Sequence, residues 1–198
     1  MNDTIENSAI IIGSNGGIGA AIKQELLADK KYKNIICYSK NHDTKLDITN
    51  EQEIADAAYE LKKEKFKITL LINTVGYLHD SNFLPEKKIS DLNNSYLLNC
   101  FKLNTIGHAL VIKYFYPLME QNNKSVLASL SARVGSISDN YLGGWYSYRS
   151  SKAALNQIIK SVSIELHRKK SKLILVAIHP GTVLTKLSRP FIKNHNYF

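Results

Sequence analysis

Residues 9–19 read Ala-Ile-Ile-Ile-Gly-Ser-Asn-Gly-Gly-Ile-Gly, and the order of strand, turn and helix signals in this stretch decides the fold. Ala9–Ile12 is a short apolar run, typical of a strand buried on both faces of a parallel sheet. Gly13, Gly17 and Gly19 follow with the spacing G-x-x-x-G-x-G, where a helical pattern begins. Glycines allow a tight turn and a close approach of the backbone to a pyrophosphate, and the helix N-terminus offers free N–H groups. The stretch therefore predicts a dinucleotide-binding loop.

Short apolar runs and helical segments alternate along the rest of the chain. Further strands are expected at Ile35–Tyr38, Ile68–Ile72, Ser125–Ser129 and Leu173–Ile178, and helices at Gly17–Ala28, Glu51–Lys63, Ile89–Gln121 and Ser147–Arg168. This order predicts an α/β fold in one domain over residues 1–198: a single Rossmann-like, doubly wound parallel sheet with helices on both faces.

Two segments depart from a complete Rossmann fold. Between Tyr38 and Leu46 there are too few residues for a helical crossover, so we expect either a very short strand or an extended chain across the sheet edge. Residues Thr185–Phe198 are too few for another helix and strand. The usual C-terminal helix–strand unit is therefore expected to be absent.

The composition is that of an ordinary globular domain: 198 residues, 44% hydrophobic, with a net charge of +9. The lysines are scattered, without an aromatic-interleaved basic stripe, so no nucleic-acid partner is expected. No apolar run approaches the ~20 residues of a membrane span, so we expect a cytoplasmic protein without a membrane partner. Cys37 and Cys100 lie far apart and the six histidines show no ligand spacing, so we expect two reduced thiols and no metal site.

The chain resembles the short-chain dehydrogenase/reductase family over about residues 8–190, because several of the family's motifs occur here in the family's order. The first is the spacing of the glycine loop. The others are Asp47-Ile-Thr for D-[VI]-T, Asn73-Thr-Val-Gly76 for N-N-A-G, Asn104 for the helix asparagine, Tyr148-Arg-Ser-Ser-Lys152 for Y-x-x-x-K, and Pro180-Gly-Thr-Val-Leu-Thr185 for P-G-x-V-x-T. Residues 131–154 further resemble the C-factor-like branch of this family.

The resemblance implies that these motifs bind NAD(P). The cofactor-binding residues it implies are Gly13, Ser14, Asn15, Gly17, Ile18, Gly19, Ser39, Lys40, Asp47, Ile48, Asn73, Val75, Gly76, Tyr148, Lys152, Pro180, Gly181, Val183 and Thr185. The turn after the second strand reads Tyr38-Ser-Lys-Asn41, with no acidic residue to accept from the ribose 2′-OH of NAD. Because Ser39 and Lys40 can both donate to a 2′-phosphate, the sequence favours NADP, with NAD as the alternative.

Tyr148 and Lys152 are four residues apart on one predicted helix, so their side chains share a face. A nearby ammonium lowers the pKa of a tyrosine from its ordinary value of ~10, which suits the tyrosine for proton transfer. The resemblance implies that Tyr148 is the acid/base for reversible hydride transfer between nicotinamide and a small carbonyl compound or secondary alcohol. It also implies that Lys152 holds the nicotinamide ribose and that Asn104 anchors a water in the proton relay.

The catalytic serine of the family lies three residues before a glycine, and that position before Gly135 is Ala132. Ser131 is adjacent, and a bulge at a strand end can re-aim a side chain to the other face. Ser131 is therefore the candidate to orient the substrate carbonyl. The alternative is that Ala132 fills the slot and the hydrogen bond comes from elsewhere or is absent.

In the family, the outer faces of the helices near residues 89–121 and 147–168 pair across a two-fold axis. The resemblance thus implies a homodimer, with a tetramer as the alternative. A different functional class stays open as well. A non-catalytic NAD(P)-binding protein of signalling or regulation, such as a truncated family member, would account for the displaced serine and the short C-terminus.

Overall fold

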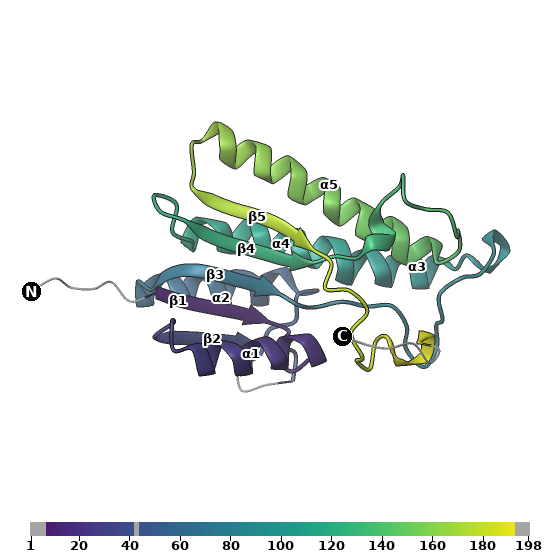
Figure 1. Ribbon diagram of the computed structural model, residues 1–198, viewed down its shortest axis with the longest axis horizontal. Helices are drawn as coiled ribbons and strands as arrows, with labels where there is room; N and C mark the ends of the chain where they lie inside the picture. The colour runs from purple at the N-terminus through teal and green to yellow at the C-terminus, as the bar shows by residue number, and fades with distance from the viewer. Residues whose placement is uncertain (1–6, 42–43, 193–198) are drawn as a thin grey trace, which may run out of the picture.

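The computed structural model describes residues 7–41 and 44–192 (Figure 1). Five parallel strands form one sheet in the order β2-β1-β3-β4-β5. They are β1 (Asn7–Ile12), β2 (Asn34–Tyr38), β3 (Lys67–Asn73), β4 (Ser125–Leu130) and β5 (Leu173–Ile178). The chain winds outward from β1 to β2 and then returns past β1 to β3, so the predicted doubly wound α/β fold is confirmed. The domain predicted over residues 1–198 also includes residues 1–6, 42–43 and 193–198, which lie outside the described part.

Helices cover both faces of the sheet, as predicted. They are α1 (Gly17–Asp29), α2 (Glu51–Glu64), α3 (Asn94–Phe101), α4 (Gly107–Phe115) and α5 (Tyr146–Arg168). Helix α1 packs on β1 and β2, whereas α2 contacts α4 and α4 contacts α5 on the opposite face (Figure 1). The core between the sheet and this second layer contains Ile10, Leu71, Leu127 and Leu155, all fully buried.

The single helix predicted over Ile89–Gln121 is wrong. A 3-10 turn at Ile89–Asp91 precedes α3, a π-helical segment at Lys102–Ile106 joins α3 to α4, and a 3-10 turn at Tyr116–Leu118 follows α4. The side chain of Asn93 accepts a hydrogen bond from the Tyr96 N–H and so starts a new helix at residue 94. Pro117 lacks an N–H donor and ends the helical segment at the other side.

Between Tyr38 and Leu46 the structure describes residues 39–41 and 44–45, which contain no helical crossover. These residues form one isolated parallel bridge, between Ser39 and Lys45, rather than a strand of the sheet. After β5, the described chain as far as Ile192 contains only a 3-10 turn at Arg189–Phe191. Residues 179–192 therefore contain no α-helix and no strand.

Candidate active site

The predicted site residues gather at one edge of the sheet, because parallel strands all end there (Figure 1). Gly13 follows β1, Ser39 follows β2, Thr74 follows β3 and Ser131 follows β4. The edge beyond the carboxyl ends, where the winding reverses between β1 and β3, is where doubly wound sheets bind ligands.

The glycine loop has no room for a side chain at Gly13 or Gly19. Gly13 has φ +85°, and the N–H groups of Gly13 and Ser14 donate to the Tyr38 carbonyl at 2.8 and 3.1 Å. A Cβ on Gly19 would lie 2.3 Å from the Gly13 carbonyl oxygen. The N-cap residue of α1 is Gly16, which has no side chain to bond the first N–H groups of the helix. The backbone N–H groups of this loop could therefore hold a pyrophosphate.

Two threonines, Thr74 and Thr185, lie against the glycine loop. The Thr74 hydroxyl lies 2.9 Å from the Ile12 carbonyl and 3.1 Å from the Gly13 carbonyl, so it ties the loop to the end of β3. Thr185, in the segment after β5, lies so near that a Cβ on Gly17 would approach its Cγ2 atom to 2.8 Å. The structure thus brings the first and last predicted cofactor motifs together.

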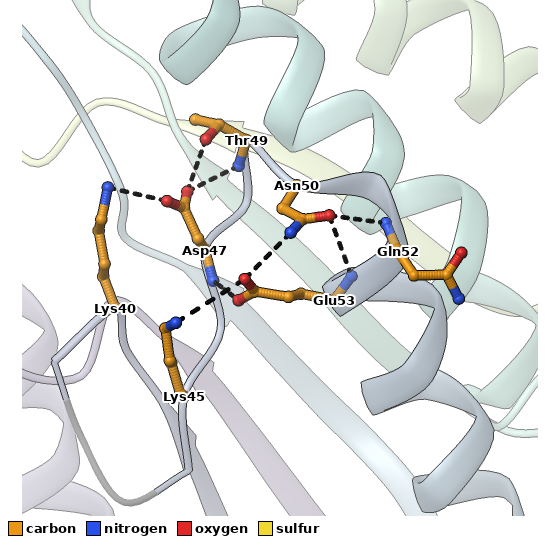
Figure 2. Close-up of polar contacts among 7 residues, drawn as sticks. All are labelled: Lys40, Lys45, Asp47, Thr49, Asn50, Gln52 and Glu53. Carbon is orange, nitrogen blue, oxygen red and sulfur yellow. Dashed lines mark hydrogen bonds and ion pairs between the residues drawn. The ribbon is translucent and has the colours of Figure 1, made fainter.

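The turn after β2 holds an ionic network around Asp47 (Figure 2). The Lys40 ammonium lies 2.8 Å from the Asp47 carboxylate, which also accepts from the N–H and hydroxyl of Thr49. Partial burial raises the pKa of Asp47, but the bonds from Lys40 and Thr49 and the Lys40 charge outweigh it and bring the pKa to about 2. Glu53 accepts from the Asp47 N–H at 2.9 Å and lies 3.9 Å from the Lys45 ammonium.

Lys40 is thus paired within the protein, although its side chain is 70% exposed. Ser39 beside it has a buried hydroxyl without a hydrogen-bond partner among the described residues. Asn15 is tied to the same turn, because its side-chain amide donates to the Asn41 carbonyl at 3.2 Å. A buried, unpartnered hydroxyl next to an exposed ammonium is consistent with a ribose or phosphate ligand at this turn.

Asn73, the last residue of β3, bonds to the segment that follows the strand. The side-chain Oδ1 of Asn73 accepts from the Val75 N–H at 3.1 Å, and Val75 packs against the core while Gly76 is exposed. The Val75 carbonyl contacts Nε2 of His108 at 2.9 Å. Burial first, and then the charge of Lys152, lower the pKa of the fully buried His108 to about 3, so its ring is neutral.

The remaining predicted cofactor residues are Ile48, Ile18 and those of the segment after β5. Ile48 is buried and lies against Gly107, where a Cβ would meet the Ile48 carbonyl at 2.7 Å. Ile18 is half-buried in the first turn of α1. Pro180 and Gly181 are exposed, and the Val183 carbonyl accepts from the Ser188 hydroxyl at 2.6 Å, which shapes the turn that carries Thr185.

Tyr148 and Lys152 lie on adjacent turns of α5 and are both buried, 8% and 2% exposed. The Lys152 ammonium donates to the Leu130 carbonyl at 2.8 Å and lies 5.9 Å from the centre of the Tyr148 ring. Burial lowers the pKa of Lys152 to about 8. Burial, with the nearby Cys100 thiol, raises the pKa of Tyr148 to about 12. This direction is opposite to the lowering expected from the sequence, because burial, which favours the neutral phenol, is the largest cause.

Asn104 lies in the π-helical segment and is fully buried. Its amide exchanges two hydrogen bonds of 2.8 Å with the backbone of Tyr77 and donates to the Ser151 hydroxyl at 3.1 Å. The residue therefore connects the segment after β3 to the helix of Tyr148 and Lys152. π-Helical turns are frequent at functional sites.

Ser131 is buried at the end of β4, and its hydroxyl donates to the side-chain oxygen of Asn156 at 2.6 Å. Asn156 is one turn beyond Lys152 on α5. The backbone N–H of Ser131 donates to the Ile178 carbonyl at 2.8 Å, which keeps residue 131 in register with β5. Ser131 therefore lies near α5, the helix that carries Tyr148 and Lys152, and its hydroxyl donates its hydrogen bond to Asn156.

Aromatic rings lie next to Tyr148. The Trp145 ring contacts the Tyr148 ring edge-on at 6.1 Å and the Phe191 ring at 5.1 Å, between ring centres. Phe191 in turn lies 5.3 Å from His79, whose Nε2 is 3.2 Å from the Leu187 carbonyl. These contacts hold the segment after β5 against the first turn of α5, which carries Tyr148.

Several residues of this edge were not identified from the sequence. Glu86 and Asn156 bond to residues that are 61 and 25 positions away, so no local spacing points to them. His108 follows Asn104 by four residues on the helical pattern, which is the one signal that would place it on the same inner face. Among residues 7–41 and 44–192, no cluster of acidic, histidine or cysteine side chains could hold a metal ion. None of the helices in these ranges is long and apolar enough to cross a membrane.

Comparisons with known proteins agree with this arrangement. The profile of the short chain dehydrogenase family matches residues 7–196. The chain is 26% identical to 1-hydroxy-2-glutathionyl-2-methyl-3-butene dehydrogenase of Rhodococcus over 202 residues, covering 96% of this chain and 84% of that protein. It is 32% identical to the C-signal protein of Myxococcus xanthus over 102 residues, covering 52% of this chain and 60% of that protein.

Solved structures share the fold. A short-chain dehydrogenase/reductase from Burkholderia multivorans with bound NADP superposes with a TM-score of 0.81 at 23% identity, covering 95% of this chain and 84% of that one. The carbonyl reductase Sniffer of D. melanogaster gives a TM-score of 0.75 at 23% identity, covering 91% and 83%. With the family profile matched over nearly the whole chain and the motifs assembled at one sheet edge, the protein belongs to the short-chain dehydrogenase family.

Proposed function

We propose that the protein is an NADP-dependent carbonyl reductase of the short-chain type. The observation that carries this proposal is the pair Tyr148 and Lys152, buried on adjacent turns of α5 at the same sheet edge as the glycine loop. When bound, the nicotinamide would supply a hydride to a carbonyl carbon, or accept one from a secondary alcohol. Family membership supports an oxidoreductase, while the residue roles and the substrate are our inference.

Tyr148 acts as the proton donor during reduction. Its pKa of about 12 means that the phenol keeps its proton near neutral pH, ready to give it to the carbonyl oxygen as negative charge develops there. Lys152 stands nearby as an ammonium below about pH 8 and stabilises the phenolate that remains. Asn104 holds the segment after β3 against α5, and a water at this asparagine would return a proton from solvent.

The test follows NADPH absorbance with a panel of ketones and aldehydes. Tyr148→Phe keeps the ring packing but removes the proton donor, so turnover should fall by about 10²–10⁴-fold while the NADPH dissociation constant stays nearly constant. Tyr146→Phe, two residues earlier on the same helix, is the matched control and should retain activity. Full activity of Tyr148→Phe would refute the proposed role.

The preference for NADP rests on Ser39 and Lys40. The buried Ser39 hydroxyl has no partner within the described residues, and the exposed Lys40 ammonium can turn from Asp47 to a 2′-phosphate. We expect NADPH to bind more tightly than NADH, and Lys40→Ala to weaken NADPH binding by about tenfold, since exposed charge pairs are screened. Lys45→Ala, which loses only the longer Glu53 pair, is the control. Equal affinity of the wild type for both cofactors would contradict this preference.

We also propose a homodimer formed through the outer faces of α3, the π-helical segment and α5, with a tetramer as the alternative. Apolar side chains are exposed there, among them Leu98 (60%), Ile106 (51%) and Ile164 (41%). Sedimentation at micromolar concentration tests it, and a purely monomeric protein would exclude it.

A second candidate function is cofactor binding without turnover. It is favoured by the Ser131 hydroxyl, which donates to Asn156, and by Ala132 at the position of the family's serine. Tight NADPH binding combined with no reduction across the whole panel would make this the better account.

A further inference from the structure

Glu86 is a buried carboxylate in the loop between β3 and α3, only 3% exposed. Its two carboxylate oxygens accept hydrogen bonds from Ser147, one from the N–H at 3.2 Å and one from the hydroxyl. Its backbone carbonyl accepts from the Trp145 N–H at 2.6 Å. Among the ion pairs of the described residues, none includes Glu86. A buried carboxylate without a cation depends entirely on such hydrogen bonds.

These bonds complete the N-terminus of α5, which has no cap of its own. The N-cap residue Trp145 is left-handed, with φ 51°, and its side chain makes no capping bond. The first turn of this 23-residue helix carries no acidic residue. Glu86 supplies both missing elements from 61 residues away: an acceptor for a first-turn N–H group and a negative charge at the positive end of the helix.

The same bonds fix two residues that precede Tyr148, Trp145 and Ser147. Ser147 precedes Tyr148 directly, and the Trp145 ring contacts the Tyr148 ring edge-on. Gly144, with φ +64°, lets the backbone pass over the loop, since a Cβ there would lie 3.3 Å from the Glu86 carbonyl. The next turn of α5 is held separately, by the Lys152 bond to Leu130 and by the Thr105 hydroxyl bond to the Ser151 carbonyl at 2.7 Å.

We propose that Glu86 is a positioning residue that holds the first turn of α5, and with it the phenol of Tyr148, in the geometry needed for proton transfer. The inference rests on the proposed role of Tyr148. Its physical core, that Glu86 keeps the first turn ordered, is independent of any activity. Loss of Glu86 should therefore loosen Tyr148 while leaving Lys152 and the glycine loop in place.

The test compares the intact wild type with Glu86→Gln, which keeps the shape and removes the charge, and with Ser147→Ala, which removes the hydroxyl donor. Hydrogen exchange should become about tenfold faster in residues 145–149 and stay unchanged in residues 153–160. Turnover should fall by about 10²-fold, as expected for a misplaced catalytic group, with KM and the NADPH dissociation constant within about twofold. The double variant should lose little more than either single variant, because both act through one contact.

Glu120→Gln is the matched control, because Glu120 also accepts backbone N–H bonds, from Asn122 at 2.7 Å, but precedes β4 at the opposite sheet edge. It should change neither the exchange of residues 145–149 nor turnover. Unchanged exchange in Glu86→Gln would overturn the proposal, as would additive losses in the double variant. If the wild type reduces no carbonyl compound, the proposed function fails. Faster hydrogen exchange confined to residues 145–149 in Glu86→Gln would still support the proposal that Glu86 orders the first turn of α5.

Discussion

The glycine loop between β1 and α1 is held mainly by backbone contacts, whereas the proposed catalytic end around Tyr148 and Lys152 is made of buried side chains. In the loop, Gly13 and Ser14 donate backbone N–H groups to a neighbouring strand, and an added Cβ at Gly19 would collide with the backbone. At the catalytic end, Lys152 and Asn104 depend on partners 22 and 27–47 residues away. We therefore expect an added side-chain atom to disrupt the structure of the loop. At the catalytic end, we expect the loss of a distant hydrogen-bond partner to disrupt the structure.

The largest effect is expected from adding one methyl group to the loop. In Gly19→Ala the new Cβ would lie 2.3 Å from the Gly13 carbonyl and 2.7 Å from the Thr74 hydroxyl, so the backbone must shift. We expect the free energy of unfolding to fall by ~1–3 kcal/mol and NADPH binding to be lost. Thermal unfolding and cofactor titration measure the two effects.

Gly76→Ala is the control for stability, because a Cβ there meets no atom closer than 3.9 Å. It should unfold at nearly the wild-type temperature. If Gly19→Ala were as stable as Gly76→Ala and still bound NADPH, the loop would be more adaptable than its contacts indicate, and the contrast with the catalytic end would disappear.

The catalytic end should instead respond to pH. Because burial lowers the pKa of Lys152 to about 8, its ammonium is present below that pH and is lost as pH rises through it. Tyr148, with a pKa of about 12, keeps its proton over the same range. For the reduction, kcat/KM should therefore be flat below pH 8 and fall by about tenfold per pH unit above it.

Lys152→Arg separates charge from geometry, because a guanidinium stays protonated throughout this range. Whatever activity it retains should not decline between pH 8 and 10. A wild-type profile that is flat to pH 10 would show that the lysine is not needed as an ammonium, and the proposed stabilisation of the phenolate would be wrong.

The same contrast explains how much could be predicted from the sequence. Each predicted strand overlaps an observed one, and α1 and α2 end within one residue of the prediction, because apolar period and glycine placement are local signals. The break at Asn93 was not predicted, although an N-cap asparagine is a local signal. The π-helical segment that holds Asn104 was not predicted either, since the bonds of Asn104 are tertiary contacts. Glu86 could not be predicted, because a lone glutamate in a polar loop carries no sign of the helix end that it meets.

Lys40 shows the limit in another way. The sequence identified its position at the end of β2, but its pairing with Asp47 depends on how the extended segment folds back. Likewise the motif spacing led to Ala132 and made the adjacent Ser131 the candidate, while the direction of the Ser131 hydroxyl depends on its partner Asn156 on α5. The position of a residue within a motif can be predicted from the sequence. The hydrogen-bond or ion-pair partner of its polar atoms depends on tertiary packing.

The smallest effect is expected at Ser131. A serine hydroxyl has one proton, and here that proton goes to Asn156, so orienting a substrate carbonyl requires the hydroxyl to turn and give up this bond. A hydrogen bond of this kind is worth ~0.5–1.5 kcal/mol, so Ser131→Ala should lower kcat by no more than about tenfold. Asn156→Ala, which frees the hydroxyl, should retain or raise kcat if Ser131 serves the substrate. If instead Ala132 fills the family's serine slot, Ala132→Ser should raise kcat and Ser131→Ala should alter only stability. Measuring kcat and unfolding temperature for these three variants decides which of the two adjacent positions faces the substrate.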